Sequence, residues 1–404
     1  MNKYNLKKMT DHYHVEVGVY QTYHHGEHIC GDVFLSKRIP EENRVLCVLS
    51  DGMGSGVKAN VLATLTATIA INLSIEHKQA KTIADIIMKA LPVCSERNIS
   101  YATYTIVDVN SDTNEVTILE YDNPQTIVMR GYRVMEPNWE KVNFENKNAD
   151  RRLQDLNTVT FIPQLEDRII FCSDGITQSG LGKGLVTGWG RNNLREEIRN
   201  IITDNSSISA AELAEKIVKK AAANDLHVPK DDLSCAVIYF REPRRTMICS
   251  GPPLNPGKDA EFAEKLRSFA GRKIVSGATT TEIISRELKR TVIDEPIVDH
   301  TLPPMSKMEG IDLVTEGVLT LSKVIYLLAN VINTNYQYGR GPADKMCQLL
   351  LESDEIHILV GTKINADNID LSQPVEVEIR KNIIQRLAKI LMDKYMKVVY
   401  MEFM

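Results

Sequence analysis

Apolar and polar residues alternate with a period of two near the start of the chain, and this pattern predicts β-strands. The segment HVEVGVY at residues 14–20 alternates in this way, and VFLSKRI and RVLCVLS follow as two further strand-like runs. More strands are expected within 101–138, as a pair at TVTFI and DRIIFCS, and at LSCAVIYF. Such a succession of strands favours antiparallel sheets over a regular alternation of strand and helix.

Helices are predicted in two blocks between these strands. The first is one long helix from about Val57 to Leu91, rich in Ala, Leu and Ile with few helix breakers before Pro92. The second consists of two helices, at about 192–204 and 209–224, after a glycine-rich loop. We therefore expect an α+β domain in which helices cover antiparallel sheets.

The last part of the chain has a different pattern. The stretch 241–257 contains four prolines and a basic cluster, which predicts a boundary between one domain over 1–242 and a second over 243–404. After it, RKIVSGATTTEIISREL and DLVTEGVLTLSKVIYLLANVI each predict a strand, a turn and a helix, and EIHILVGTKIN predicts a third strand. This alternation favours a smaller α/β domain. Three basic residues are interpreted as parts of a solvated linker: Arg241, Arg244 and Arg245.

Composition narrows the possible classes of protein. The net charge of −5 shows no basic surplus that would indicate nucleic-acid binding. The polar start of the chain has no apolar core of a secretory signal, and no run approaches the roughly 18–20 apolar residues of a membrane helix. The 7 cysteines contain no C-x-x-C pair, so neither a zinc site nor a redox motif is indicated. We expect a cytoplasmic protein that binds neither nucleic acid nor membrane.

Acidic residues recur where apolar strands begin or end. They are Asp32 before VFL, Asp51 after VLCVLS, Asp174 after IIFCS, and Asp231 and Asp232 before LSCAV. Carboxylates gathered at one sheet edge would repel one another unless divalent cations neutralised them, and oxygen ligands select Mg²⁺ or Mn²⁺ over zinc. A pair of such ions is a common device for attacking phosphate esters. A single Asp-Gly is more often a plain turn, and spacing alone leaves the convergence of these residues open.

Four of these segments resemble, in order, the motifs of metal-dependent protein phosphatases of the type 2C class. They are GDVFLSK, VLCVLSDGMGSGVKA, IIFCSDGI and KDDLSCAVIYF, and they span residues 30–240. The form DGMGSG-x-x-A is most similar to the bacterial branch typified by stage II sporulation protein E. This resemblance implies an αββα sandwich with a binuclear Mn²⁺ or Mg²⁺ centre that hydrolyses phosphoserine or phosphothreonine through metal-activated water.

The resemblance also implies roles for individual residues. Asp51 should bridge both ions, the Gly52 carbonyl should bind one of them, Asp32 should contact the centre, and Asp174 and Asp231 should hold the other ion. Asp232 ranks second to Asp231 as a ligand. The helix after DGMGSG is the candidate switch element, and Asp122-Asn123-Pro124, where many relatives have a Gly-His-Pro-like turn, contributes no site residue.

Several alternatives stay open. The substrate implied by the resemblance is a phosphorylated protein, with an anti-sigma-factor antagonist as one type, but the residues equally allow a small phosphorylated metabolite. A pseudo-phosphatase or signalling scaffold is the alternative from another class, with the C-terminal domain binding a phosphate-bearing ligand. The intact Asp32, Asp51, Asp174 and Asp231 favour the enzyme.

Two further groups of residues invite a functional interpretation. Three histidines precede the Gly31-Asp32 motif, namely His24, His25 and His28; we interpret them as surface residues at the rim of the site, one of which could donate a proton to the leaving oxygen. In the C-terminal domain, SGATTTEII offers a helix start that could bind an anion, although a capped helix explains it too. If this loop meets TEGVLTL and VGTKIN at one sheet edge, a phosphate or nucleotide pocket is plausible.

Overall fold

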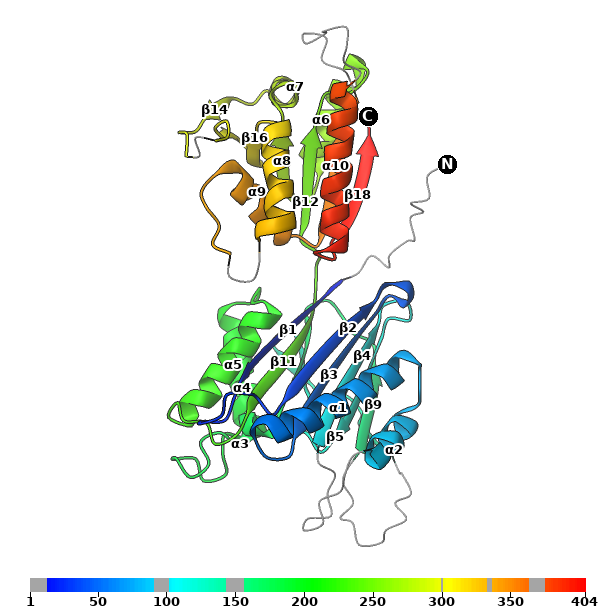
Figure 1. The fold of residues 1–404 in the computed structure, drawn as a ribbon, viewed down its shortest axis with the longest axis vertical. Helices are drawn as coiled ribbons and strands as arrows, with labels where there is room; N and C mark the ends of the chain where they lie inside the picture. Colours follow the sequence, from blue (N-terminus) through cyan, green and yellow to red (C-terminus); the bar gives the residue numbers. More distant parts are fainter. Residues whose placement is uncertain (1–12, 91–101, 143–155, 299–300, 333–335, 363–374) are drawn as a thin grey trace. The chain divides into compact units, whose positions relative to one another are not determined.

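The chain folds as two compact units, Met1–Glu242 and Pro243–Met404 (Figure 1). The structure is a computed structural model, and it describes residues 13–90, 102–142, 156–298, 301–332, 336–362 and 375–404. Each unit has its own hydrophobic cores, because the buried apolar clusters of one unit contain no residue of the other. Each unit is therefore described by itself.

The first unit contains two antiparallel sheets. One has the spatial order β2 (Val33–Ile39), β3 (Arg44–Gly52), β4 (Ala102–Asn110), β5 (Glu115–Tyr121), β9 (Leu156–Phe161) and β8 (Glu140–Lys141). The other has the order β1 (His14–Thr22), β11 (Leu233–Arg241), β10 (Asp167–Cys172), β6 (Ile127–Arg130) and β7 (Arg133–Met135). Their alternating side chains leave one face of each sheet for the other sheet and one for helices.

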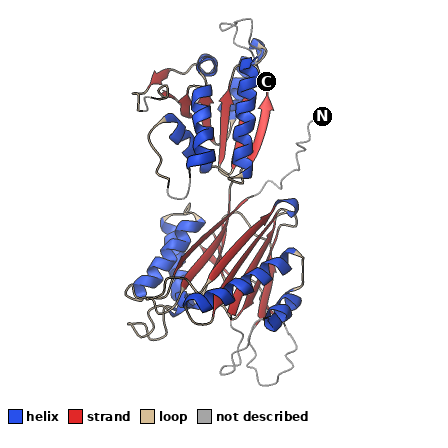
Figure 2. Ribbon diagram, in the orientation of Figure 1, coloured by secondary structure: helices blue, strands red, loops and turns tan. Residues whose placement is uncertain are grey.

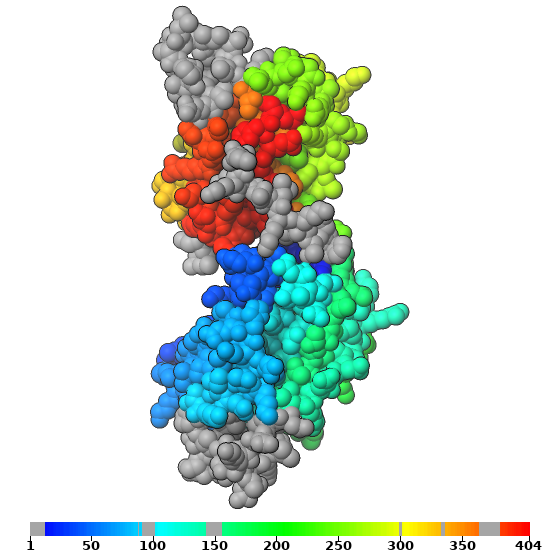
Figure 3. All heavy atoms as spheres, turned by 90° about the vertical axis from the view of Figure 1, so that its right-hand side faces the viewer, coloured from blue at the N-terminus to red at the C-terminus, as the bar shows by residue number. Residues whose placement is uncertain are grey.

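The two sheets pack face to face and helices cover both outer faces, as Figure 2 shows. The apolar layer between the sheets includes Cys47, Ile118, Phe171 and Ile238, all fully buried. Helices α1 (Gly56–Ile75) and α2 (Ala80–Ala90) cover the six-stranded sheet and lie at the surface in Figure 3. Helices α4 (Gly190–Asp204) and α5 (Ala210–Asn224) cover the five-stranded sheet. This arrangement confirms the αββα sandwich.

Helix α1 is the one described helix long and apolar enough, by length and composition, to cross a membrane. A helix that covers a sheet passes the same test, so the finding is weak evidence for a membrane span. The buried face of α1 is built from small residues, among them Ala63, Ala67 and Ala70, and it packs on apolar side chains of β3 such as Leu46 and Val48. Small side chains allow a close approach between helix and sheet.

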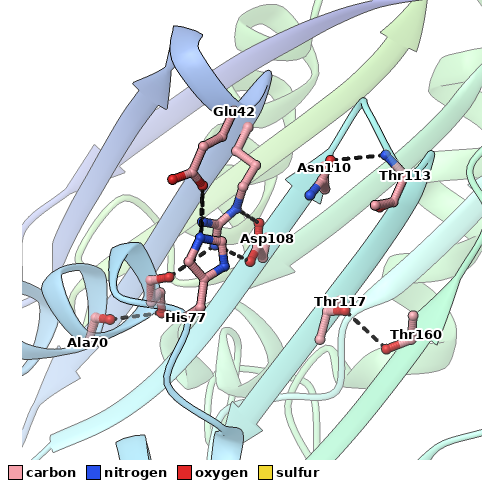
Figure 4. A network of polar contacts seen from close by, with 10 residues as sticks. Glu42, Ala70, His77, Asp108, Asn110, Thr113, Thr117 and Thr160 are labelled. Carbon is pink, nitrogen blue, oxygen red and sulfur yellow. Dashed lines mark hydrogen bonds and ion pairs between the residues drawn. The ribbon is translucent and has the colours of Figure 1, made fainter.

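The single long helix predicted over about 57–91 is wrong, because the chain breaks it between α1 and α2. His77 has a φ of 54°, which ends the helical path. The buried Arg44 at the start of β3 donates to the Ser74 carbonyl at 3.0 Å, so it caps the end of α1. Its guanidinium also binds Asp108 through two hydrogen bonds of 3.1 and 2.6 Å and Glu42 at 2.7 Å. Figure 4 labels these two acidic partners and His77 beside them. The predicted end at Leu91 lies outside the described residues.

The predicted strand pair TVTFI and DRIIFCS is also wrong, although both strands exist. Strand β9 pairs with β5 and β8, whereas β10 pairs with β11 and β6, so the two strands belong to different sheets. A short helix, α3 (Asp174–Gln178), follows β10 and was not predicted. The chain between β9 and β10 thus crosses from one layer of the sandwich to the other.

The second unit is a three-layer α/β domain around one seven-stranded sheet. Its spatial order is β14 (Val292–Asp294), β15 (Ser306–Met308), β16 (Ile311–Thr315), β13 (Arg272–Ser276), β12 (Arg245–Ser250), β17 (Glu355–Val360) and β18 (Val398–Phe403). Helices α6 (Asp259–Ser268) and α7 (Ala278–Leu288) pack on one face. The other face carries α8 (Val318–Tyr326) with its extension Leu327–Val331, α9 (Pro342–Leu351) and α10 (Val375–Asp393).

The stretch 241–257 is more than a linker. Strand β12 lies inside it and occupies the middle of the second sheet. The interpretation of its arginines as solvated is wrong for Arg241, which is buried and pairs with Glu16 of β1. Arg245 binds Glu355 at 2.7 Å and keeps 38% of its side chain exposed. The prolines that suggested a domain boundary lie before and after this strand.

Candidate metal centre

The strand registers bring the predicted aspartates to one end of the sandwich. Val33 pairs with Ser50, so Asp32, before β2, and Asp51, at the end of β3, lie side by side on one sheet. Cys172 pairs with Cys235, so Asp174 after β10 and Asp231 before β11 lie together on the other sheet. In its protonated form the carboxyl of Asp51 donates a hydrogen bond to the carboxylate of Asp174, which joins the two pairs across the sandwich.

Asp32 is the most deeply buried of these carboxylates. It is 3% exposed, and neither of its oxygens has a hydrogen-bond partner among the described residues. The hydroxyls of Ser173 and Ser234 lie nearby, but Ser173 donates to the Asp232 carbonyl, and Ser234 accepts from Gln21. A buried carboxylate without a partner is costly, because it has lost its hydration and gained nothing in exchange. Its two oxygens therefore fit a bound cation.

Burial, together with mutual repulsion, raises the pKa values of these carboxyl groups. Burial raises the pKa of Asp51 to about 10, and the charges of Asp32, Asp174 and Asp231 add to the rise. Burial also raises the pKa of Asp32 to about 7, against the opposing effect of the nearby serine hydroxyls. The pKa of Asp231 rises to about 6, from burial and from the charge of Asp174. Four carboxylates held this close are stable only with protons or cations between them.

The donor set matches hard divalent cations. It consists of carboxylate oxygens, which suit Mg²⁺ or Mn²⁺ better than zinc, and the Gly52 carbonyl stays a predicted further ligand. Among the described residues, no three His, Cys, Asp or Glu side chains already surround one point as ligands of a single ion would. The hydrogen bond between Asp51 and Asp174 occupies oxygens that ligation requires, so it would have to open when ions bind.

The glycines after Asp51 and Asp174 have a reason in packing. A Cβ on Gly52 would lie 2.0 Å from the carbonyl oxygen of Ala59, so the glycine lets α1 approach β3. A Cβ on Gly175 would lie 2.2 Å from the carbonyl oxygen of Asp232, so that glycine lets α3 approach the start of β11. Packing therefore requires glycine directly after each of these two aspartates.

Residues 41–241 match the family model described as stage II sporulation protein E (SpoIIE). This part of the chain is SpoIIE-like, and the name SpoIIE domain is used here for the first unit, Met1–Glu242. The phosphoserine phosphatase RsbX of Bacillus subtilis (strain 168) is 28% identical to the chain over 117 residues, which are 28% of this chain and 53% of RsbX. The chain thus spans about half the length of that relative. The resemblance noted in the sequence motifs is confirmed.

Two solved structures are similar in fold to the SpoIIE domain. One contains the PP2C phosphatase domain and a fragment of the regulatory domain of SpoIIE from Bacillus subtilis; it is 19% identical, with a TM-score of 0.46, over 57% of this chain and 64% of that chain. The other is RsbX in complex with magnesium, 19% identical with a TM-score of 0.40, over 56% of this chain and 96% of that chain.

Asp231 and Asp232 have different environments in the SpoIIE domain. Asp232 is buried, and its Oδ1 accepts the backbone N–H of His24 at 3.0 Å, so it ties the preceding loop to the start of β11. Asp231 is half-buried, and its Oδ1 accepts the N–H of Asp232 at 2.9 Å. Asp231 remains the better candidate for a ligand, and Asp232 holds the loop in place.

The three histidines of the SpoIIE domain separate in the structure. His25 and His28 are exposed, as expected for the rim of a site. His24 lies close enough to Asp231 for its charge to oppose the rise in the pKa of that carboxyl, and its Nδ1 is buried with no partner among the described residues. Of the three, His24 is the one placed beside the carboxylates, and its role in proton transfer stays a hypothesis.

Sequence reasoning missed the polar residues that surround the aspartates. Gln178 of α3 donates to Asp174 Oδ2 at 2.6 Å, and the hydroxyls of Ser173 and Ser234 face Asp32. Glu27 accepts from Ser55 at 3.3 Å, next to the start of α1. The serines could have been found, because each stands beside an Asp motif at a strand end. Nothing local in the sequence indicates Gln178 or Glu27.

Proposed function

We propose that residues 1–242 hydrolyse phosphoserine or phosphothreonine in a protein substrate, with two Mn²⁺ or Mg²⁺ ions held by the aspartates. The observation that carries the proposal is the convergence of Asp32, Asp51, Asp174 and Asp231 at one end of the sandwich, where Asp32 keeps two buried oxygens without a partner among the described residues. The SpoIIE match over residues 41–241 supports the same activity. The name of RsbX as a phosphoserine phosphatase supports the choice of substrate class.

Each aspartate has a role that its position suggests. Asp51 contacts Asp174 across the gap between the sheets and has Asp32 and Asp231 close by, which suits a carboxylate shared by two ions. Asp32 and the Gly52 carbonyl would complete the ligands on one sheet, and Asp174 and Asp231 those on the other. When bound, the ions supply positive charge for the phosphoryl oxygens and lower the pKa of water. No serine, cysteine or histidine nucleophile is required.

The residues around the ligands keep this arrangement rigid. Gln178 holds Asp174 by a hydrogen bond of 2.6 Å, and Asp232 fixes the loop that carries His24. Such second-sphere contacts orient ligands and tune their affinity. We further propose a cytoplasmic signalling role, in which the substrate is a small phosphorylated regulator of the anti-sigma-factor antagonist type.

The test measures hydrolysis of a phosphoserine protein and of p-nitrophenyl phosphate by the full chain, with Mn²⁺, with Mg²⁺ and with EDTA. We expect metal-dependent turnover that Asp51→Asn reduces at least about 100-fold, because it removes the carboxylate between the two ions. Asp112→Asn is the matched control, since Asp112 is exposed in the β4–β5 turn and is hydrogen-bonded to Asn43 and Asn110, away from the aspartates.

Three outcomes separate the alternatives. Metal-dependent turnover lost in Asp51→Asn and kept in Asp112→Asn supports the phosphatase. If p-nitrophenyl phosphate is hydrolysed and the phosphoserine protein is not, the substrate is a small phosphate ester. A folded chain that binds Mn²⁺ calorimetrically yet turns over neither substrate, or that binds no metal at all, refutes the enzyme and leaves the pseudo-phosphatase.

A further inference from the structure

The parallel part of the second sheet reverses its order between two neighbouring strands. Five strands are parallel, in the spatial order β16, β13, β12, β17 and β18. In sequence order β12 comes first, β13 and β16 follow on one side of it, and β17 and β18 then follow on the other side. In open sheets of this kind, ligands bind outside the carboxyl ends of the strands at the point of reversal. Here that point lies between β12 and β17.

The loops at this edge approach one another closely through glycines. Gly251, Gly277 and Gly361 directly follow β12, β13 and β17, and Gly317 follows β16 after one further residue. A Cβ on Gly361 would lie 2.1 Å from the Pro252 carbonyl oxygen, so the loops after β12 and β17 touch at the point of reversal. The three Gly-containing loops that the sequence singled out thus meet at one edge, as far as the described residues extend; 363–365 lie outside them.

Two helices begin at this edge side by side. Helix α7 starts directly after Gly277 and α8 directly after Gly317, and a Cβ on Gly317 would lie only 3.4 Å from the Gly277 Cα. Neither helix has a side-chain cap at its N-terminus. The first N–H groups of a helix have no partner within it, and the helix dipole places positive charge there. Two adjacent uncapped N-termini form a strong site for an anion.

A buried hydroxyl without a partner lies in the first turn of α8. Thr320 is fully buried, and its Oγ1 has no hydrogen-bond partner among the described residues. Cα–Cβ bonds in a helix tilt toward its N-terminus, so the Thr320 side chain leaves α8 on the side of the turn that begins at Gly317. Thr280, in the first turn of α7, differs because its Oγ1 accepts the N–H of Gly251 at 2.8 Å. The Thr320 hydroxyl is therefore a free donor for a ligand at this edge.

A cationic side chain lies at the same edge. Arg380 of α10 places Nη1 2.6 Å from the position that a Cβ on Gly251 would take. The bond from Gly251 to Thr280 links this guanidinium to the first turn of α7. The exposed carboxylate of Glu316 accepts the N–H of Gly317 at 3.2 Å, so it uses a group that precedes the helix and leaves the amides of 318–320 to a ligand.

We propose that this edge binds a small molecule carrying a phosphate group, with the phosphate between the starts of α7 and α8 and beside Arg380. Three features lie along the same edge of the sheet: the reversal point at β12 and β17, the paired helix N-termini after β13 and β16, and the buried Thr320 hydroxyl. The loops contain neither G-K-[ST] nor G-x-G-x-x-G, so the site differs from the common phosphate-binding fingerprints. It does not depend on the phosphatase activity of the first unit.

The test titrates the full chain calorimetrically with ADP and, separately, with inorganic phosphate, in EDTA so that the aspartates of the first unit hold no metal. We expect ADP to bind, about tenfold more weakly in Thr320→Val, which removes one donor at nearly constant volume, and weaker still in Arg380→Met. Arg267→Met is the control. Arg267 lies in the last turn of α6, which runs back from this edge, and it is exposed and pairs with Glu264.

The outcomes decide both the site and the source of the phosphate. ADP binding that both variants weaken and Arg267→Met preserves supports the site. Inorganic phosphate binding as tightly as ADP, with the same dependence on Thr320, also supports it and makes free phosphate the ligand. The proposal is overturned if neither ADP nor inorganic phosphate gives a heat of binding, or if wild type and Thr320→Val bind with equal affinity. Because Thr320→Val is isosteric, it stays informative even if Arg380→Met fails to fold.

Discussion

Asp51→Asn should make the metal-free protein more stable while it abolishes turnover. In the absence of ions, burial and three neighbouring carboxylates raise the pKa of Asp51 from 3.8 to about 10. At about pH 7.5 the folded state must keep a proton that the unfolded chain has lost. At about 1.36 kcal/mol per pH unit between the unfolded pKa and that pH, the cost has a ceiling of about 5 kcal/mol. Water at the half-buried Asp51 reduces it to about 2–3 kcal/mol.

The sign of the pH dependence follows from the same shift. Because the folded pKa lies above the unfolded one, the contribution of Asp51 to stability is fully present below pH 3.8 and is lost as the pH rises. The asparagine side chain of the variant carries no charge and can still donate a hydrogen bond to Asp174. The advantage of Asp51→Asn should therefore grow from about pH 4 to about pH 8 and should shrink when Mn²⁺ stabilises the wild type.

Urea unfolding followed by tryptophan fluorescence reports on the stability of the first structural unit, which contains Asp51. Both tryptophans of the chain, Trp139 and Trp189, lie in the first unit, so the second unit contributes no tryptophan signal. The expected difference corresponds to a midpoint about 1 M higher for Asp51→Asn at about pH 8 with EDTA. A midpoint equal to or below that of the wild type, or a gap that widens toward about pH 4, would refute the electrostatic reasoning.

Two other substitutions probe the sandwich. Arg44→Met removes the two hydrogen bonds to Asp108 and the cap on the Ser74 carbonyl. Because Asp108 is partly exposed and can be rehydrated, we expect the free energy of unfolding to fall by about 2–3 kcal/mol. The urea midpoint should then be about 1 M lower. Burial raises the pKa of Glu120 to about 7 from 4.5, so its stabilising effect is complete below pH 4.5 and lost toward pH 7. Glu120→Gln, which keeps an acceptor for the Thr126 N–H, should gain up to about 3 kcal/mol over wild type between about pH 5 and about pH 8 in the same assay.

Local patterns were sufficient for most strands of the first unit and for the αββα class. Alternation marked β1, and runs such as VLCVLS marked the strands buried on both faces. The helix break at His77 could not be predicted, because no proline or glycine stands near it in the sequence. The contact that caps this end comes from the guanidinium of Arg44, which reaches the end of α1 from another element. Strand pairing failed for β9 and β10 for a similar reason, since local pattern does not say which layer a strand joins.

The candidate site likewise contains residues that local sequence indicates and residues that only tertiary contacts reveal. Asp32, Asp51, Asp174 and Asp231 could be picked out because each stands at the end of an apolar strand, and the sheet registers bring such ends together. Gln178 could not, since it reaches Asp174 from a short helix that local propensity does not predict. In the second unit, β12 was hidden by flanking prolines and by charges that find partners only in the folded chain, as Arg245 does with Glu355.

The pairing of β1 with β11 has a consequence for synthesis on the ribosome. The register from His14↔Arg241 to Thr22↔Leu233 joins the two ends of the first unit in sequence. At about 5–20 residues per second, the chain between Thr22 and Leu233 takes on the order of 10–40 s to emerge. Until then β1 has no partner, and the five-stranded sheet lacks the strand that links β1 to β10. The nascent chain must keep β1, with its alternating apolar residues, unpaired through that interval.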